Sequence, residues 1–240
     1  MFQTHKIFYI LIGVISCLTL ASCADQYKIA GNSSIASLDG RMLYLKVTDG
    51  QKMSAIDSSE VIHGRFNFMG MMDSIMMVEL CMDNESVLPL VIENGNLTIK
   101  MDNAEQRVSG GPLNDRLYHF LTRKNQLDNQ YMELSYEEMR MMMKGCSPEY
   151  IHAKLAPRAK ELAKAIEDME TSFIISNYDN VLGPGIFIML CNQYQYPILT
   201  DQMKYILKKA PSSFTNHPYI KEYVKIAKRN SKLLQVQDSH

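Results

Sequence analysis

Two hydrophobic periods divide the sequence near residue 111. Between Tyr27 and about Gly110, short runs of β-branched, aromatic and other apolar residues partly alternate with polar ones, as is typical of strands. The runs cover residues 42–47, 65–68, 75–80, 88–92 and 97–100, and the pairs Asp39-Gly40, Asp49-Gly50, His63-Gly64 and Asn94-Gly95 punctuate them. Turns this short join antiparallel neighbours, so the pattern predicts an antiparallel sheet, sandwich or partly open barrel of about seven or eight strands.

Helical spacing replaces the strand pattern after residue 111. One helical stripe contains Leu113, Leu117, Phe120, Leu121 and Leu127. Ser147 followed by Pro148 favours a helix start, because serine caps first turns and proline fits within them. We expect Pro157 to kink this second helix or to begin the next one.

Three further helices are expected towards the C-terminus. Gly183-Pro184-Gly185 predicts a break before an apolar helix that carries residues 188–191. A short helix is expected over residues 200–209, and a last one from Pro218 to about Leu234. An all-β half followed by an all-helical half favours an α+β fold, with a β domain over residues 23–111 and a helical region over 112–240.

The N-terminal residues follow the pattern of a secretion signal. Lys6 precedes an apolar run over residues 7–20, and small residues then lead to Cys23. The order Leu20-Ala21-Ser22-Cys23 resembles the lipobox of bacterial lipoproteins, whose signal is removed in front of a cysteine that carries a diacylglycerol. The apolar run is too short to span a bilayer comfortably.

These features predict a signal peptide over residues 1–22 and lipidation at Cys23, which leaves 218 of the 240 residues. We expect anchoring to the bacterial cell envelope, with the outer membrane favoured over the inner and the protein facing the periplasm or the cell surface. The partners expected are therefore the membrane, through that lipid, and an envelope protein or a small ligand.

Charge is unevenly distributed along the chain. The formal net charge is −1, so nothing indicates a nucleic-acid partner. Residues 24–111 contain seven Lys/Arg and twelve Asp/Glu, whereas residues 200–240 contain eight and three. We interpret the basic end as a solvated helix face; contact with anionic lipid headgroups or an acidic partner is the alternative.

Three cysteines follow Cys23 at wide spacing: Cys81, Cys146 and Cys191. The sequence contains no Cys-x-x-Cys, so neither a thioredoxin-type redox pair nor a paired-cysteine zinc site is expected. Cys81 and Cys191 lie inside apolar runs and are expected to be buried thiols. A single disulfide between two of these three cysteines is the alternative, because an oxidising envelope allows it to form.

Methionine is the compositional oddity, with 18 residues. Two clusters stand out: Met69, Met71, Met72, Met76 and Met77, and then Met139, Met141, Met142 and Met143. We expect them to pack in the core; an adaptable apolar contact surface and Cu(I) binding are the alternatives.

The histidines after the expected signal peptide are His63, His119, His152, His217 and His240. None lies in a His-Glu-x-x-His context, and the sequence contains neither Gly-x-Ser-x-Gly nor a phosphate-binding glycine loop. The paired acids Glu137-Glu138 and Glu167-Asp168 are expected on solvated helix faces. The sequence thus predicts no catalytic residue, cofactor or metal site.

Five ordered segments carry a family resemblance: residues 27–31, 39–45, 56–70, 92–97 and 108–115. Together they resemble the N-terminal domain of unknown function of bacterial thioredoxin-like (AhpC/TSA-type) disulfide oxidoreductase lipoproteins, over about Tyr27 to Leu127. The later helices resemble the helical linker of those proteins. The resemblance implies the β fold, its helical companion and an envelope address.

This sequence differs from the long relatives in the thioredoxin domain. Their Trp-Cys-x-x-Cys site follows the helices, whereas this sequence has no Trp and stops at His240, about where that domain should begin. Their redox activity is therefore not carried over. We expect a non-enzymatic binding or interaction module; the alternative is an accessory component of a thioredoxin-like disulfide or oxidative-stress pathway.

Residues of the quoted segments also have structural explanations. Phe66 and Phe68 point to the same face of a strand and are expected in the sheet core. Gly64 and Gly70 suit turns, and Asp57, with Ser58, suits the satisfaction of backbone groups at a turn or strand end.

Overall fold

The computed structural model describes residues 25–49, 52–83 and 85–237. The expected signal peptide and the expected lipidation site, Cys23, lie outside these residues. In the described part of the chain, no helix combines the length and the hydropathy of a membrane span.

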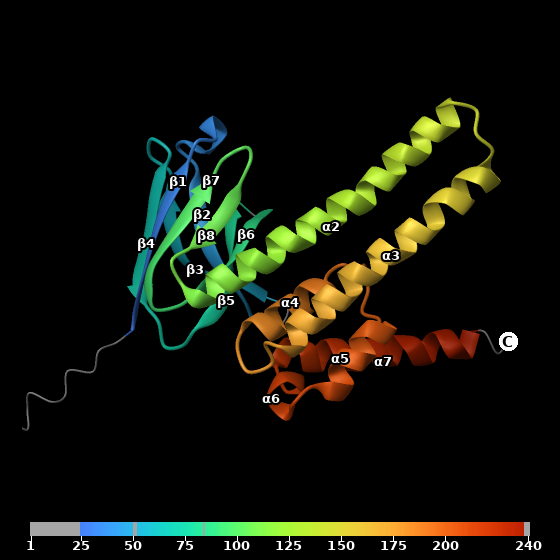
Figure 1. Cartoon of the computed structure of the whole chain (residues 1–240). Helices are drawn as coiled ribbons and strands as arrows, with labels where there is room; N and C mark the ends of the chain where they lie inside the picture. Colours follow the sequence, from blue (N-terminus) through green and yellow to red (C-terminus); the bar gives the residue numbers. More distant parts are fainter. Residues whose placement is uncertain (1–24, 50–51, 84, 238–240) are drawn as a thin grey trace, which may run out of the picture.

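Eight strands form two four-stranded sheets (Figure 1). They are β1 (Gln26–Ser33), β2 (Met42–Asp49), β3 (Lys52–Glu60), β4 (Arg65–Met71), β5 (Met76–Met82), β6 (Glu85–Ile92), β7 (Gly95–Met101) and β8 (Gln106–Ser109). One sheet has the order β4-β1-β7-β8 and the other the order β3-β2-β5-β6. The sheets are not closed into a barrel, so of the two architectures expected from the sequence the sandwich is confirmed.

One strand pair departs from the antiparallel expectation. β1 and β7 pair in parallel, with Tyr27 opposite Gly95 and Ser33 opposite Met101, whereas the other described pairs are antiparallel. The expectation rested on short turns between sequential strands. It does not apply to two strands that the intervening chain joins through the other sheet.

Aromatic rings cover two glycines between β1 and β4. Gly31 lies opposite Phe66, and a Cβ on Gly31 would lie 2.1 Å from the Phe66 ring. Tyr27 lies opposite Gly70 and would meet a Cβ there in the same way. Gly70 is therefore a strand residue under a ring, and its expected place in a turn is wrong. Such pairs fix strand register, because the ring fills the space that the glycine leaves.

Gly64 does lie in the expected turn. Its φ is +71°, and His63 before it has a φ of +51°. A Cβ on Gly64 would also lie 2.3 Å from the backbone oxygen of Ser33, so both conformation and space require glycine there.

Tyr27 and Asp57 join the two sheets. The Tyr27 hydroxyl on β1 donates to Asp57 Oδ2 on β3 at 3.0 Å. Burial, with the Asp57 carboxylate beside it, raises the pKa of Tyr27 to about 12. Asp57 Oδ1 accepts from the backbone N–H of Ser58 at 2.7 Å. This carboxylate therefore satisfies a backbone group, but inside β3 and not at the expected turn or strand end.

The helices follow β8 directly. They are α2 (Pro112–Met143), α3 (Pro148–Ile175), α4 (Leu182–Cys191), α5 (Asp201–Lys209), α6 (Ser212–Thr215) and α7 (Pro218–Gln237), and a short 3-10 helix, η2 (Ala36–Leu38), lies between β1 and β2. α2 and α3 form a long hairpin that extends away from the sandwich, while α4 to α7 gather at its base (Figure 1). The all-helical C-terminal half is confirmed.

Local side chains cap two of the helices. The Ser147 hydroxyl caps α3 by accepting from the N–H of Tyr150, and Thr200 caps α5 by accepting from the N–H of Met203. Pro157 lies inside α3, so it does not begin a new helix there.

The segment Gly183-Pro184-Gly185 lies in the first turn of α4. The break expected in front of the helix is therefore wrong. First-turn N–H groups have no intrahelical acceptor, so Pro184 removes no helical hydrogen bond. Gly183 has a packing role instead, because a Cβ on it would lie 2.3 Å from the backbone oxygen of Asn177.

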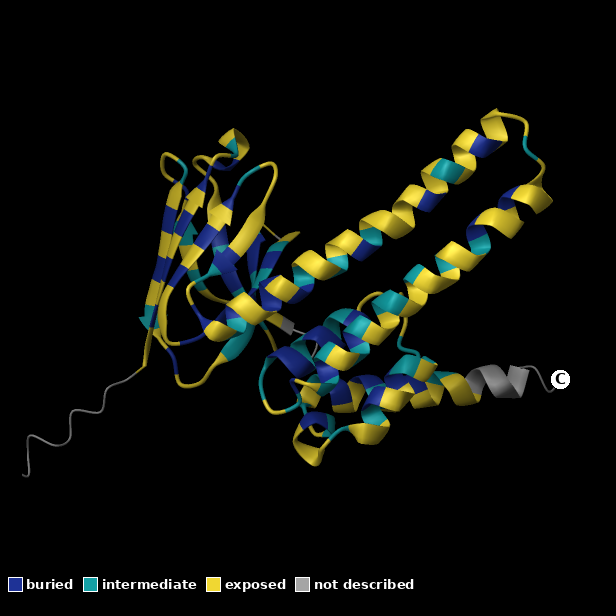
Figure 2. Ribbon diagram, in the orientation of Figure 1, coloured by how far each residue is buried: buried dark blue, intermediate teal, exposed yellow. Residues whose placement is uncertain are grey.

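One hydrophobic core joins the sandwich to the helices at its base. It contains β residues such as Leu90 and Ile92 together with Leu117 of α2, Phe187 of α4 and Ile220 of α7. A second, small cluster lies in the outer part of the hairpin and contains Leu134, Met141, Ile151 and Leu155. Figure 2 shows the same division, with buried residues concentrated in the sandwich and at the base and mostly exposed residues along the hairpin.

Methionines of the two clusters divide between core and surface. Met72 and Met141 are buried, and Met76 and Met77 pack against the core. The exposed members are Met69, Met71, Met139, Met142 and Met143. The expectation of core packing is wrong for these five, because they lie on strand and helix faces that no other described element covers.

Candidate functional site

Two residues of the resemblance segments, Glu93 and Asn114, meet at the junction of sandwich and helices. Glu93 Oε2 accepts from the backbone N–H of Leu113 at 3.2 Å, and Oε1 accepts from the N–H of Asn114 at 2.9 Å. The carboxylate thereby caps α2, whose own N-cap Gly111 has no capping side chain. Glu93 is 4% exposed and Asn114 is fully buried.

The Asn114 side chain binds the end of β6 as well. Its Oδ1 accepts from the N–H of Val91 at 2.9 Å, while its Nδ2 donates to the Val91 oxygen at 2.7 Å and to Glu93 Oε1 at 2.9 Å. The hydrogen bonds of these two side chains are thus directed at one another and at backbone groups. This pair holds the fold together and is not a binding site.

The three cysteines described by the structure are free thiols. Cys81 and Cys191 are buried, as expected, and burial raises the pKa of both, that of Cys191 to about 12. Cys146 is partly exposed and lies between α2 and α3 at the outer end of the hairpin. The disulfide left open by the sequence is not formed in this structure.

Thiol labelling checks this burial pattern. In the native protein we expect N-ethylmaleimide to modify Cys146 and to leave Cys81 and Cys191 unmodified, because a buried, protonated thiol does not react. Peptide mass spectrometry of native and urea-unfolded protein measures each site, and all three should react after unfolding. Equal rates at all three sites in the native protein would contradict the structure.

One described histidine is partly buried, and two of the paired acids form ion pairs with neighbouring cations. His217 has a buried Nδ1 without a hydrogen-bond partner in the described chain, and burial lowers its pKa. Glu137 accepts from Arg158 at 2.6 Å and Asp168 pairs with Lys164 at 2.7 Å. Over the described residues, no group of three or more His, Cys, Asp or Glu side chains is placed to hold a metal ion.

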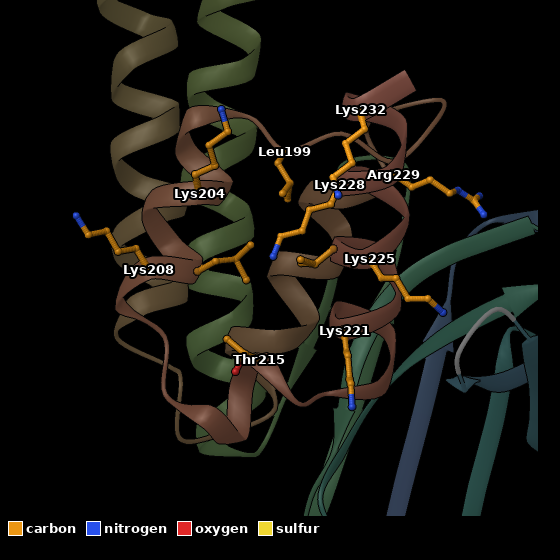
Figure 3. A pocket seen from close by; sticks show the side chains of 11 residues that line it. Leu199, Lys204, Lys208, Thr215, Lys221, Lys225, Lys228, Arg229 and Lys232 are labelled. Carbon is orange, nitrogen blue, oxygen red and sulfur yellow. The ribbon is translucent and has the colours of Figure 1, made fainter. Parts of the chain in front are cut away.

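A groove of about 820 Å³ between α5, α6 and α7 is the candidate site (Figure 3). Leu199, Leu207 and Val224 provide its apolar floor. The cations around it are Lys204, Lys208, Lys221, Lys225, Lys228, Arg229 and Lys232. We call this cavity the basic groove. Its volume lies in the range of small-molecule pockets.

Two of the seven cations have acidic partners close by. Lys204 pairs with Asp201 at 2.9 Å and Lys225 with Glu222 at 3.1 Å. The remaining five, Lys208, Lys221, Lys228, Arg229 and Lys232, form no ion pair with any described residue. The groove is therefore strongly electropositive and attracts anions.

The lysines of α7 differ in direction. Lys228 and Lys232 extend from α7 into the space between α7 and α5, whereas Lys225 and Arg229 project away from it (Figure 3). Both pairs have i,i+4 spacing on one helix, so they occupy two adjacent stripes. Lys228 and Lys232 are the cations placed to contact a molecule in the groove.

Hydrogen-bonding capacity in the groove is one-sided. Lysine and arginine side chains donate and cannot accept. Thr215 is the single uncharged polar side chain among the described residues that line the groove, and its hydroxyl already faces the backbone oxygens of Pro211 and Ser212, both at 3.4 Å. The lining side chains thus suit a ligand that accepts hydrogen bonds and carries negative charge.

The basic excess over residues 200–240 was visible in the sequence, where we interpreted it as a solvated helix face, with anionic headgroups or an acidic partner as the alternative. What the sequence pattern missed is the floor, since Leu199, Leu207 and Val224 come from a loop and two helices. Their apolar character is unremarkable in each segment by itself. Only the tertiary arrangement of α5 and α7 brings them to the same groove.

A second cavity of about 670 Å³ lies between the β3-β2-β5-β6 sheet and helices α4 and α6. Its walls include Met76, Met77 and Met189, with Glu79 on the sheet side. Burial raises the pKa of Glu79. This cleft is more mixed in chemistry than the basic groove, and no described feature selects one kind of ligand for it.

The fold places this chain among the α+β proteins. It is a two-sheet sandwich packed on a helical base, and the basic groove lies in that base. Residues 27–117 match the family model described as a domain of unknown function (DUF4369). The match covers β1 to β8 and the start of α2, including the Glu93–Asn114 pair. It confirms the domain-of-unknown-function part of the resemblance. No curated protein matches this chain.

Proposed function

We propose that this protein is a non-enzymatic binding module of the bacterial cell envelope, and that the basic groove is its binding surface. The observation that carries the proposal is the combination of Lys228 and Lys232, which enter the groove and form no ion pair with a described residue, with an apolar floor. Solvated charge alone would not need a concave apolar floor beneath it. The ligand class that fits is an anion with an apolar part.

Matched double variants test the groove. Lys228→Ala with Lys232→Ala removes the two cations that enter the groove, and Lys225→Ala with Arg229→Ala removes two that point away. After crosslinking in intact cells and enrichment, mass spectrometry should find molecules bound to the wild type and to the second variant but lost from the first. If both variants retain the same molecules as the wild type, the groove is not the binding surface.

The envelope address rests on the lipobox-like sequence at residues 20–23. We expect Cys23 to carry an acyl anchor, with the outer membrane favoured over the inner. Cells grown with an alkyne fatty acid should label the wild-type protein, and Cys23→Ser should abolish the label and release the protein from the membrane fraction. Cys146→Ser is the control and should be labelled like the wild type. Labelling of the Cys23→Ser variant would contradict the proposed acylation of Cys23.

Participation in a thioredoxin-like disulfide or oxidative-stress pathway is the second candidate. The family match favours it, because this domain of unknown function is known from thioredoxin-like lipoproteins. Cys146 is the partly exposed thiol that a partner could reach, since Cys81 and Cys191 are buried. A mixed disulfide trapped at Cys146 would support this candidate. A variant that lacks Cys81, Cys146 and Cys191 is the second test, and unchanged behaviour of cells that carry it would exclude direct thiol chemistry.

A further inference from the structure

We propose that the basic groove binds a single-chain phosphorylated lipid, with the acyl chain on the floor and the phosphate between Lys228 and Lys232. This inference rests on the proposed function and names the ligand of the same site.

The floor fits one acyl chain. Leu199, Leu207 and Val224 are partly buried and supply the apolar side chains that line the groove between α5 and α7. The lysine stems beside it add methylene surface, because long cationic side chains lie along apolar surface and leave the charge in water. A hydrocarbon chain gains from leaving water there and has no polar group that needs a partner.

The walls disfavour an extended peptide. Each peptide unit carries an N–H that must find an acceptor when it leaves water, and an unmet one is costly. Of the described polar side chains that line the groove, only Thr215 can accept a hydrogen bond, because its hydroxyl donates to backbone oxygens and keeps its lone pairs; one acceptor does not serve the several N–H groups of an extended peptide. A lipid phosphate carries acceptor oxygens and negative charge, so it matches walls of this kind.

The number and type of cations favour phosphate over a fatty-acid carboxylate. Lys228 and Lys232 enter the groove from α7, one helical turn apart, and neither forms an ion pair with a described residue. A phosphate can engage several ammonium groups at once through three oxygens, whereas a carboxylate offers two. Lysine acts as a point charge suited to phosphate.

Native mass spectrometry of the full-length protein released from detergent micelles tests this ligand. The probe is monolauroyl glycerol phosphate. Glycerol 3-phosphate carries the headgroup without the chain, monolauroyl glycerophosphocholine carries the chain with a zwitterionic head, and laurate carries the chain with a carboxylate. We expect tight binding of the probe alone among the four.

Substitution of Lys228 and Lys232 by alanine should weaken binding of the probe roughly 30-fold, the effect of two lost charge contacts. The Lys225→Ala, Arg229→Ala variant should stay within about threefold of the wild type, because its side chains point away. Leu207→Ser should weaken the binding of monolauroyl glycerol phosphate, because it removes apolar surface from the floor. It should leave the binding of glycerol 3-phosphate unchanged.

Other outcomes would overturn the inference in distinct ways. Equal binding of glycerol 3-phosphate shows an anion site without a lipid, and equal binding of laurate shows a fatty-acid site. If no lipid binds but captured partners in cells still depend on Lys228 and Lys232, the proposed function stands and the lipid is wrong. If neither lipids nor cellular partners depend on those lysines, both fail.

Discussion

Replacing Phe66 by alanine should lower the free energy of unfolding by about 4 kcal/mol. The Phe66 side chain is 1% exposed and covers Gly31 on the neighbouring strand. It also meets the Phe68 ring edge-on, with the ring centroids 6.0 Å apart. Its removal leaves a cavity that the strand backbones cannot close without losing their register. Urea unfolding followed by circular dichroism measures the effect.

Met69 on the same strand provides the control. Its side chain is 68% exposed and lies on the opposite face from Phe66 and Phe68. Met69→Ala should change the free energy of unfolding by less than about 0.5 kcal/mol. A similar loss for Phe66→Ala and Met69→Ala would contradict the packing described for β1 and β4.

Replacing Glu93 by alanine should destabilise the protein by about 3 kcal/mol. The carboxylate accepts from two backbone N–H groups of α2 and from the Asn114 side chain, and all of these are left without their acceptor. The first turn of α2 also loses the negative charge beside its dipole. Because this junction joins the sandwich to the helical base, the loss should appear in one cooperative transition.

A double-mutant cycle separates the pair from its parts. Asn114→Ala should cost a similar amount, since the N–H and oxygen of Val91 lose their partners. The Glu93→Ala, Asn114→Ala variant should lose less than the sum, because the two side chains share hydrogen bonds. Glu85→Ala is the control, because Glu85 is an exposed acid at the start of β6, the strand that ends directly before Glu93. Additive losses would show that the two residues act independently.

The fold class followed from local pattern because each part of it is recorded in neighbouring residues. The change of period near residue 111 separates strands from helices, since side chains alternate along a strand and recur every 3.6 residues along a helix. The caps at Ser147 and Thr200 and the turn at Gly64 are equally local. Buried Cys81 and Cys191 followed from the apolar runs around them.

The candidate site was only half visible in the sequence. The basic excess after residue 200 was plain, but whether it formed a solvated face or a groove depended on what lay between the lysines. Sequence spacing on α7 does not show which stripe faces α5. The structure directs Lys228 and Lys232 inwards and Lys225 and Arg229 outwards.

The sequence by itself determined the order of strands and helices, the turn at Gly64, the helix starts at Ser147 and Thr200, and the sign of charge along the chain, because these depend on residues close together in the chain. The tertiary structure decided the parallel pairing of β1 with β7, the ring over Gly70, the contact of Glu93 with Asn114 and the floor of the basic groove. Each of these depends on residues far apart in sequence. Which of them meet is set by how all the apolar faces are buried together, and that choice is not written in any single segment.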